Sequence, residues 1–165
     1  MSDLLEGLPP VIASHMRLVV LGSFPGAASL RQQQYYGHPR NQFWPIVSAI
    51  WRLDLPTRPY AERIDALRQR GVGLWDVYAR CRREGSLDQA IEDAELNDLG
   101  SLRSRAPQLM LVAHNGGESA RARRHTAALG CEVVRLPSTS PANASWSFER
   151  KLAAWRGAFE LAGVA

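Results

Sequence analysis

The amino-acid sequence predicts an α/β fold with a mainly parallel sheet, built as one domain over residues 1–165. Three observations lead to this prediction. Four short apolar runs are typical of buried strands, helical patterns lie between and around them, and no linker, repeat or low-complexity segment divides the chain. With 165 residues, of which 45% are hydrophobic and 22% charged, the chain is long enough to bury a core without disulfides or metals.

The predicted strands are the apolar runs at residues 18–21, 72–77, 109–112 and 133–136. Helical patterns are found in four segments, at residues 43–51, 64–70, 116–129 and 148–159. Gly71 and Gly130 can end the second and the third of these helices. In the last helix the apolar side chains recur at helical spacing, and Ser145 or Ser147 can cap its start.

Composition excludes several classes of protein. No stretch approaches the roughly 20 apolar residues of a membrane helix, and the acidic start of the chain does not resemble a signal peptide. Cys81 and Cys131 form no Cys-x-x-Cys pair, and none of the four histidines has metal-ligand spacing with another. We therefore expect a cytoplasmic monomer without a disulfide scaffold, an iron–sulfur cluster or another metal site.

The charge balance allows a nucleic-acid partner. Lysine and arginine number 20 against 16 acidic residues, which gives a net charge of +4. Lys151 is the one lysine in the sequence, so the other basic residues are arginines, whose forked guanidinium groups match phosphates. The alternative is that the arginine bias reflects genome base composition and ordinary surface chemistry.

All four predicted strands end in polar or turn-forming residues. These ends are Gly22–Gly26, Trp75–Tyr78, His114–Gly117 and Pro137–Asn143. In parallel α/β sheets, ligands bind beyond the carboxyl ends of the strands. A turn alone would explain one such end, whereas four together favour a single ligand site.

The first of these ends is a tight turn, Gly22-Ser23-Phe24-Pro25-Gly26. Its glycines allow close approach of the backbone, and its N–H groups can hold a phosphate or a base edge. The spacing fits neither a P-loop nor a Gly-x-Ser-x-Gly turn, so a hydrolase nucleophile at Ser23 is not favoured. Glycines that serve the turn geometry alone are the other interpretation.

The segment from Tyr35 to Trp44 is dense in aromatic and polar side chains. Aromatic rings offer stacking surfaces for a base, worth about 1–3 kcal/mol each in single-strand binders, although a core position suits Trp44 better. Asn41 carries donors and an acceptor, so it can orient a water, read a base edge or cap the following helix.

Other strand ends supply further candidates. Asp76 stands in an apolar run, where a carboxylate is costly unless it is hydrogen-bonded, so it is expected to pair with an arginine or to accept from a ligand. Asn115 is either a turn residue or a second polar contact. The loop at residues 137–143 is stiffened by two prolines and carries three hydroxyls that can bond phosphates, unless it is an ordinary connection.

Together, these segments resemble the uracil-DNA glycosylase superfamily and, within it, the hypoxanthine-DNA (deoxyinosine) glycosylase branch. The matching pieces come in the family's order over about residues 18–156. They are Leu21–Gly26 with Ser29-Leu30, Tyr35–Trp44, Gly73–Val77 with Cys81, Arg83 and Gly85–Asp88, His114–Gly116, and Leu136–Asn143.

The resemblance implies a three-layer α/β/α architecture with a four-stranded parallel sheet and no organic cofactor. It also implies a repair enzyme whose partner is DNA containing deaminated bases. Such an enzyme everts the base and hydrolyses its N-glycosidic bond, which leaves an abasic site. Hypoxanthine is the expected main substrate, and uracil is the second.

The sequence departs from the wider superfamily at two positions. Phe24 stands where mismatch-specific relatives have an asparagine that positions water. Leu136 stands where many members have a histidine that helps to stabilise the leaving base. The hypoxanthine branch offers Asn41 instead, so the resemblance implies Asn41 as the catalytic residue that orients the attacking water.

Two further groups complete the expected site. The expected base-binding residues, with Phe24 or Phe43 as the stacking ring, are Gly22, Ser23, Phe24, Phe43, Asp76 and Asn115. An ionised Asp76 accepts but cannot donate, so it would suit the ring N1–H of hypoxanthine, which adenine lacks. The expected DNA-binding residues, of which the last three would press toward the vacated base stack, are Tyr36, His38, Arg40, Ser138, Thr139, Ser140, Pro141, Ala142 and Asn143.

Two other functions stay open on the sequence alone. One is a catalytically weak DNA-binding protein of the same fold, which Phe24 and Leu136 favour. The other is a small-molecule hydrolase that uses Ser23 or Asp76, although no Ser/His/Asp spacing supports it. Release of a base from an oligonucleotide with a single inosine separates the glycosylase from the first alternative.

Overall fold

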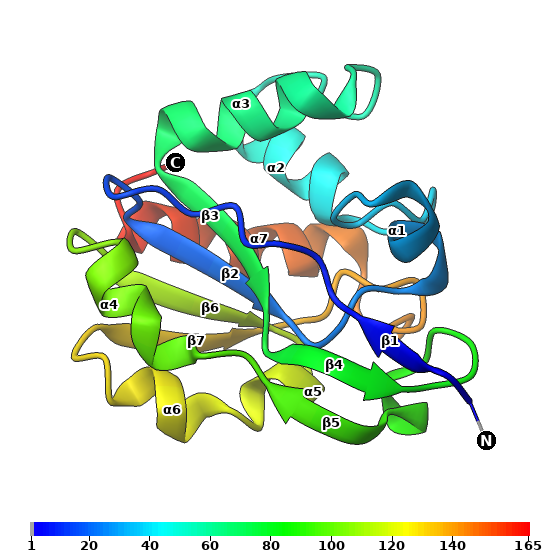
Figure 1. Ribbon diagram of the computed structural model, residues 1–165. Helices are drawn as coiled ribbons and strands as arrows, with labels where there is room; N and C mark the ends of the chain where they lie inside the picture. Colours follow the sequence, from blue (N-terminus) through cyan, green and yellow to red (C-terminus); the bar gives the residue numbers. More distant parts are fainter. Residues whose placement is uncertain (1) are drawn as a thin grey trace.

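A four-stranded parallel sheet lies at the centre of the protein, for which a computed structural model describes residues 2–165 (Figure 1). The strand order is β3-β2-β6-β7. The strands are β2 (Leu18–Gly22), β3 (Val72–Asp76), β6 (Leu111–Asn115) and β7 (Glu132–Leu136). The predicted α/β fold with four parallel strands is therefore confirmed, with strand ends shifted by up to three residues.

Both faces of the sheet are covered by helices. In β2, Leu18 and Val20 contribute to one core and Val19 and Leu21 to the other, because successive side chains of a strand alternate. The first face is covered by α2 (Phe43–Trp51), α3 (Tyr60–Arg70) and α7 (Phe148–Leu161). The second is covered by η2 (Leu99–Ser101), α4 (Leu102–Arg105) and α6 (Arg123–Ala127) (Figure 1). This arrangement is the three-layer architecture that was expected.

Strand register brings the polar strand ends together. Gly22 at the end of β2 is the partner of Asp76 at the end of β3, and Asn115 at the end of β6 is the partner of Leu136 in β7. Because all four strands are parallel, the segments that follow them leave the sheet at the same edge.

A second, antiparallel sheet of order β1-β4-β5 was not predicted from the sequence. Its strands are β1 (Leu4–Glu6), β4 (Tyr78–Arg82) and β5 (Glu92–Leu96). The chain passes from β3 into this sheet while it stays bonded to the first turn, because Val77 N–H donates to Gly22 O at 2.8 Å and Tyr78 N–H donates to Ser23 O at 3.0 Å. The second sheet therefore adjoins the carboxyl edge of the first. A short helix, α1 (Ala27–Gln32), also went unpredicted.

The predicted helix over residues 116–129 is two short helices, α5 (Gly117–Ala120) and α6. Both are tied to His114 of β6, whose ring bonds Ser119 Oγ and Thr126 Oγ1, each at 2.8 Å. Burial lowers the pKa of His114 to about 4, so the ring is neutral and serves packing. These side-chain contacts override the helical spacing of the sequence.

The helix boundaries predicted at Gly71 and Ser147 agree with the structure, whereas α6 ends at Ala127, before the predicted stop at Gly130. Gly71 follows α3 with a φ of 81°, and the Ser147 side chain accepts a hydrogen bond from Arg150 N–H at the start of α7. Within residues 2–165, none of the helices has the length and apolar character needed to span a bilayer.

Candidate active site

A cavity of about 350 Å³ opens at the carboxyl edge of the parallel sheet. This volume falls in the range of small-molecule sites, which is roughly 300–1,000 Å³. The cavity is lined by Asp76, Asn115, residues 22–29, Tyr35, Tyr36, His38, Asn41, residues 86–89 and residues 138–143. It therefore collects all four predicted strand ends and the segment that carries Asn41.

Gly22 and Asp76 form one wall of the cavity. A Cβ atom at Gly22 would collide with Asp76 Oδ1 and would lie 3.4 Å from the Tyr36 hydroxyl. Glycine is required here because the carboxylate approaches the backbone so closely. Asp76 is 5% exposed, and its Oδ2 atom has no hydrogen-bond partner among residues 2–165.

The electrostatics of the cavity favour a proton on Asp76. Burial raises its pKa to about 7, and the nearby negative charge of Asp88 adds to the rise. The guanidinium of Arg83 acts in the opposite direction. At neutral pH the carboxyl group therefore exists in both forms, and a ligand N–H group that bonds Oδ2 would favour the ionised one.

Tyr36 was expected on the DNA-binding surface, and the structure places it in the cavity wall. Its ring stacks on Phe43 with centroids 4.3 Å apart, and its backbone φ is 56°. Its hydroxyl is buried and, like Asp76 Oδ2, lacks a hydrogen-bond partner in the described part of the chain. Phe43 is fully buried and does not line the cavity, so of the two expected stacking rings Phe24 alone lines it.

Asn41 lies just before the start of α2 and lines the cavity. Its Oδ1 atom accepts from the N–H of Phe43, the first residue of α2, at 2.9 Å, and its half-buried side chain lines the cavity. A carbonyl oxygen has two lone pairs, so this hydrogen bond leaves one of them for a further donor such as water. The N-cap residue of α2 is Gln42, without a side-chain cap, so the expected cap at Asn41 is wrong by one residue.

Asn115 lines the cavity but directs its amide to a neighbouring loop. Its Nδ2 donates to Thr139 Oγ1 and its Oδ1 accepts from Thr139 N–H, both at 3.0 Å. Thr139 is 1% exposed. The pair therefore fixes the loop to the end of β6, and both residues are engaged with each other rather than free to bind a base or a phosphate.

The loop of residues 137–143, named here the 137–143 loop, is held by its own side chains. Ser140 N–H donates to Ser138 Oγ at 3.1 Å, Ala142 N–H donates to Ser140 Oγ at 3.2 Å, and Asn143 Nδ2 donates to Ser138 O at 3.2 Å. Pro141 and Ala142 are exposed at its tip. The loop therefore has a fixed shape with a small apolar tip at the mouth of the cavity.

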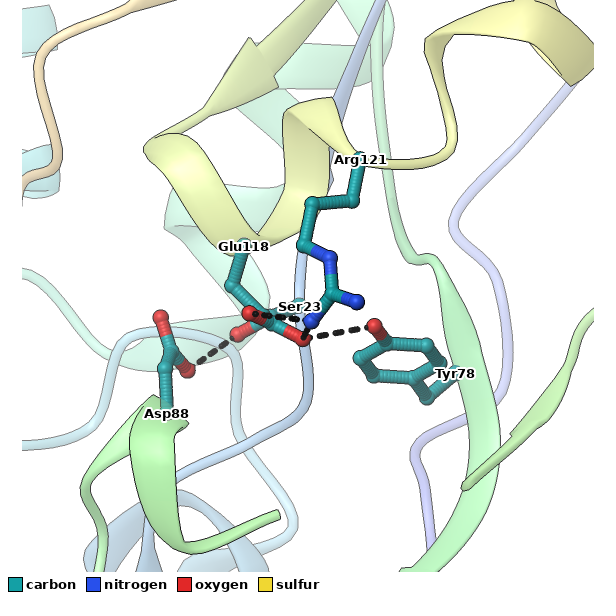
Figure 2. Close-up of polar contacts among 5 residues, drawn as sticks. All are labelled: Ser23, Tyr78, Asp88, Glu118 and Arg121. Atoms are coloured by element: carbon teal, nitrogen blue, oxygen red, sulfur yellow. Dashed lines mark hydrogen bonds and ion pairs between the residues drawn. The ribbon is translucent and has the colours of Figure 1, made fainter. Parts of the chain in front are cut away.

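The first turn is anchored through Ser23. Its hydroxyl donates to Asp88 Oδ1 at 2.5 Å, and Figure 2 shows this contact beside a second group in which Tyr78 and Arg121 both bond Glu118. Within residues 2–165 no histidine bonds Ser23, so the arrangement lacks the Ser–His pair of a serine hydrolase.

Residues 86–89 form a part of the cavity wall that the sequence-based site omitted, and Arg83 lies beside it. The Arg83 guanidinium donates to Pro25 O at 2.5 Å and lies 5.4 Å from the centroid of the Phe24 ring. Ser86 Oγ accepts from Ala27 N–H at 2.9 Å. The sequence did contain a signal for this wall, because Arg83 and Gly85–Asp88 are among the pieces that resemble the glycosylase family.

The remaining expected residues lie at the rim. His38 lines the cavity, and its Nδ1 accepts from Arg40 N–H at 3.0 Å. Arg40 is exposed and lies outside the cavity lining.

The fold and the cavity together define a three-layer α/β protein whose ligand site lies at the carboxyl edge of a parallel sheet. The chain belongs to the uracil DNA glycosylase superfamily, whose family model matches residues 9–158.

Similar proteins give a narrower comparison. A hypoxanthine DNA glycosylase from Methanosarcina barkeri (strain Fusaro / DSM 804) is 40% identical over 155 residues, which cover 94% of this chain and 98% of that one. A hypoxanthine DNA glycosylase from Methanosarcina acetivorans is 36% identical over 93% of this chain and 97% of its own. A solution NMR structure from Methanosarcina acetivorans, provisionally described as a uracil DNA glycosylase, superposes with a TM-score of 0.88 at 34% identity, over 98% of this chain and 99% of that one.

Proposed function

We propose that this protein is a DNA repair enzyme that hydrolyses the N-glycosidic bond of deaminated bases in DNA, hypoxanthine above all. Membership of the superfamily and the names of the two Methanosarcina relatives support this proposal. The observation that carries it is a pair of buried polar atoms without partners on two residues that line the cavity, Asp76 Oδ2 and the Tyr36 hydroxyl. Buried polar atoms without partners are rare, and at a cavity they indicate a ligand that supplies the missing bonds.

The pair matches one edge of hypoxanthine. That edge presents the ring N1–H as a donor and the adjacent O6 as an acceptor. Ionised Asp76 accepts from N1–H, and the Tyr36 hydroxyl donates to O6. Adenine presents the opposite pattern, an N1 acceptor beside an amino donor, so it would leave both groups unpaired at a cost of about 1–3 kcal/mol for each.

Uracil is the expected second substrate by the same reasoning. Its ring N3–H lies beside a carbonyl oxygen and so offers the same donor and acceptor order. The Phe24 ring, held from behind by Arg83, is the stacking surface for either base.

The base reaches the cavity only after eversion from the duplex. In the proposal, Ser138 and Ser140 contact phosphates beside the target, and the tip at Pro141 and Ala142 presses into the space that the base leaves. A mismatched inosine unstacks at lower cost than a matched pair, which adds selectivity.

The chemical step needs a positioned water rather than a strong base. Asn41 Oδ1 accepts one O–H of the water and directs its oxygen lone pair at C1′ of the sugar. The new bond joins that oxygen to C1′ while the N9–C1′ bond breaks, and its electron pair leaves with the base. The water gives up one proton and hypoxanthine takes one at nitrogen, so the products are the free base and an abasic site in an intact strand. Backbone N–H groups of Ser23 or Phe24 would stabilise the negative charge on the leaving base.

A panel of duplexes tests the proposal. Each duplex holds one hypoxanthine, uracil, xanthine or G·T mismatch, and alkali then cleaves any abasic site. We expect the fastest release from hypoxanthine, slower release from uracil and none from adenine in the same strands. Binding without release from any duplex would instead support the catalytically weak DNA-binding protein.

The role of Asp76 has a test of its own in the same assay. Asp76→Asn exchanges a group that only accepts for one that also donates, so the ratio of hypoxanthine to uracil release should change. An unchanged ratio would remove Asp76 from base recognition.

A further inference from the structure

Helix α7 reaches both ends of the 137–143 loop through two side chains one helical turn apart. Trp155 Nε1 donates to Pro137 O at 3.0 Å, and Lys151 Nζ donates to Asn143 O at 2.8 Å. Residues four apart lie on the same face of a helix, so the rigid helix sets the distance between the two ends of the loop.

Lys151 also joins this loop to the segment that carries Asn41. Its Nζ makes a second hydrogen bond of 2.8 Å to Gln42 Oε1, and Gln42 N–H donates to Thr139 O at 2.9 Å. An ammonium group has three donors on one atom, which lets a single side chain hold two separate segments.

The surroundings of Lys151 are unusual for a lysine. It is 2% exposed, and none of the ion pairs among residues 2–165 involves it. Both of its acceptors are uncharged oxygens. A buried cation without a carboxylate is costly, so a residue that merely filled this space would be expected to be apolar.

We propose that Lys151 is a positioning residue for base eversion: it fixes the 137–143 loop against Gln42, so that the loop tip stays rigid when it presses into the base stack. The inference rests on the proposed function. If the loop tip could move, insertion would deform the loop and would not unstack the base. Lys151 lies behind the loop, so it touches neither the base nor the attacking water.

This role separates two kinds of substrate. Duplex DNA requires the loop to displace a stacked base, whereas a base in single-stranded DNA is already unstacked. Removal of the Lys151 hydrogen bonds should therefore slow excision from duplex DNA much more than excision from single-stranded DNA. A residue that only supported the fold, or one that shaped the catalytic cavity, would affect both substrates equally.

Lys151→Met tests this with single-turnover release of hypoxanthine from the same strand in duplex and single-stranded form. We expect the duplex rate to fall by about tenfold or more, which corresponds to part of the unstacking cost, while the single-strand rate falls less than about threefold. Lys151→Arg, which keeps the charge and the donors, should restore most of the duplex rate. The control is Arg124→Met on α6, on the opposite face of the sheet. It removes one positive charge but none of the contacts with the 137–143 loop, so it should leave both rates unchanged.

Fluorescence of 2-aminopurine measures base eversion directly and complements the rates of release. With 2-aminopurine placed beside the inosine, the wild-type protein should raise its fluorescence on binding, and Lys151→Met should reduce that rise. If Lys151→Met does not fold, Lys151→Gln, which keeps an N–H donor but shortens the side chain, is assayed in the same way. Equal losses on both substrates, or no loss on duplex, would overturn the inference. A wild-type protein that releases no base from either substrate would instead refute the proposed function.

Discussion

Gly22 and Asp76 are register partners at the ends of adjacent parallel strands, and the absence of a Cβ at Gly22 is what admits the Asp76 carboxylate to the cavity wall. The pair explains why an aspartate can be buried here without a salt bridge. Asp76 lines the cavity, its second oxygen is buried without a hydrogen-bond partner among residues 2–165, and burial raises its pKa.

The raised pKa of Asp76 predicts a pH-dependent stability. The folded protein holds this proton up to about pH 7, whereas the unfolded chain releases it near pH 4. Folded Asp76 therefore binds more protons within this window, so its contribution to the free energy of unfolding should fall as pH rises, by at most about 1.4 kcal/mol per pH unit, and level off above it. Buried His114, with a folded pKa of about 4, contributes the opposite slope up to its unfolded pKa near 6.5, so the contribution of Asp76 is read from the difference between the wild type and Asp76→Asn. Urea denaturation between pH 5 and pH 8 measures this slope.

Asp76→Asn should remove this contribution, because the amide does not titrate, so the wild type should lose stability relative to Asp76→Asn as pH rises from 5 to 7. Asp65→Asn, at an exposed site on α3, is the matched control and should follow the wild-type curve. If the Asp76→Asn curve runs parallel to that of the wild type, Asp76 does not carry the proton.

Because the Tyr36 hydroxyl has no partner within residues 2–165, its removal should lower the rate of base release without lowering stability. Tyr36→Phe removes a buried group that has no partner within residues 2–165, so the free energy of unfolding should stay the same or rise. Hypoxanthine release should fall by about tenfold, which corresponds to one lost hydrogen bond to the base. Thermal unfolding and single-turnover release measure the two effects.

Tyr60→Phe should show the reverse pattern. The Tyr60 hydroxyl accepts from Tyr35 N–H at 3.0 Å, so its removal should cost about 1–3 kcal/mol of stability and leave the rate of base release near that of the wild type. Parallel behaviour of the two variants would argue against a ligand-binding role for Tyr36.

Gly22→Ala should abolish base release, because the new Cβ displaces the Asp76 carboxylate from the cavity wall. Overpacking of this kind costs about 1–3 kcal/mol of stability. Gly157→Ala offers the matched control, since nothing lies within 4 Å of a Cβ there and the position is inside α7. It should stabilise the protein by up to about 1 kcal/mol and leave release unchanged. An active Gly22→Ala protein would show that the close approach is not needed.

The parallel sheet was predictable because its strands are short runs of apolar residues with turn residues after them. The second sheet was not predictable from the sequence. All five residues of β5, Glu92–Leu96, are exposed and three of them are acidic, so the strand has no apolar pattern. It pairs with β4 in antiparallel register, in which Arg80 and Glu95 lie opposite each other and form an exposed ion pair of 2.5 Å.

The candidate site was predictable in its location and only partly in its roles. Parallel strands place Gly22, Asp76 and Asn115 at one edge wherever the helices lie. The sequence does not show that the Asn115 amide bonds Thr139, or that the Tyr36 ring stacks on Phe43. Both contacts depend on how side chains from different segments pack. The cap expected at Asn41 falls on Gln42 instead, while Asn41 bonds Phe43 N–H and lines the cavity.

Hypoxanthine release by the wild type, Asn41→Ala and Asn41→Ser, followed side by side on one inosine duplex, tests the central claim most directly. Serine keeps a side-chain oxygen that can accept from Phe43 N–H, whereas alanine removes that hydrogen bond at a cost of about 1 kcal/mol of stability. The two variants therefore differ in stability, but neither carries an amide to orient water. The wild type should release the base, and both variants should bind the duplex and lose release by about a hundredfold or more. Release by either variant near the wild-type rate would contradict the account.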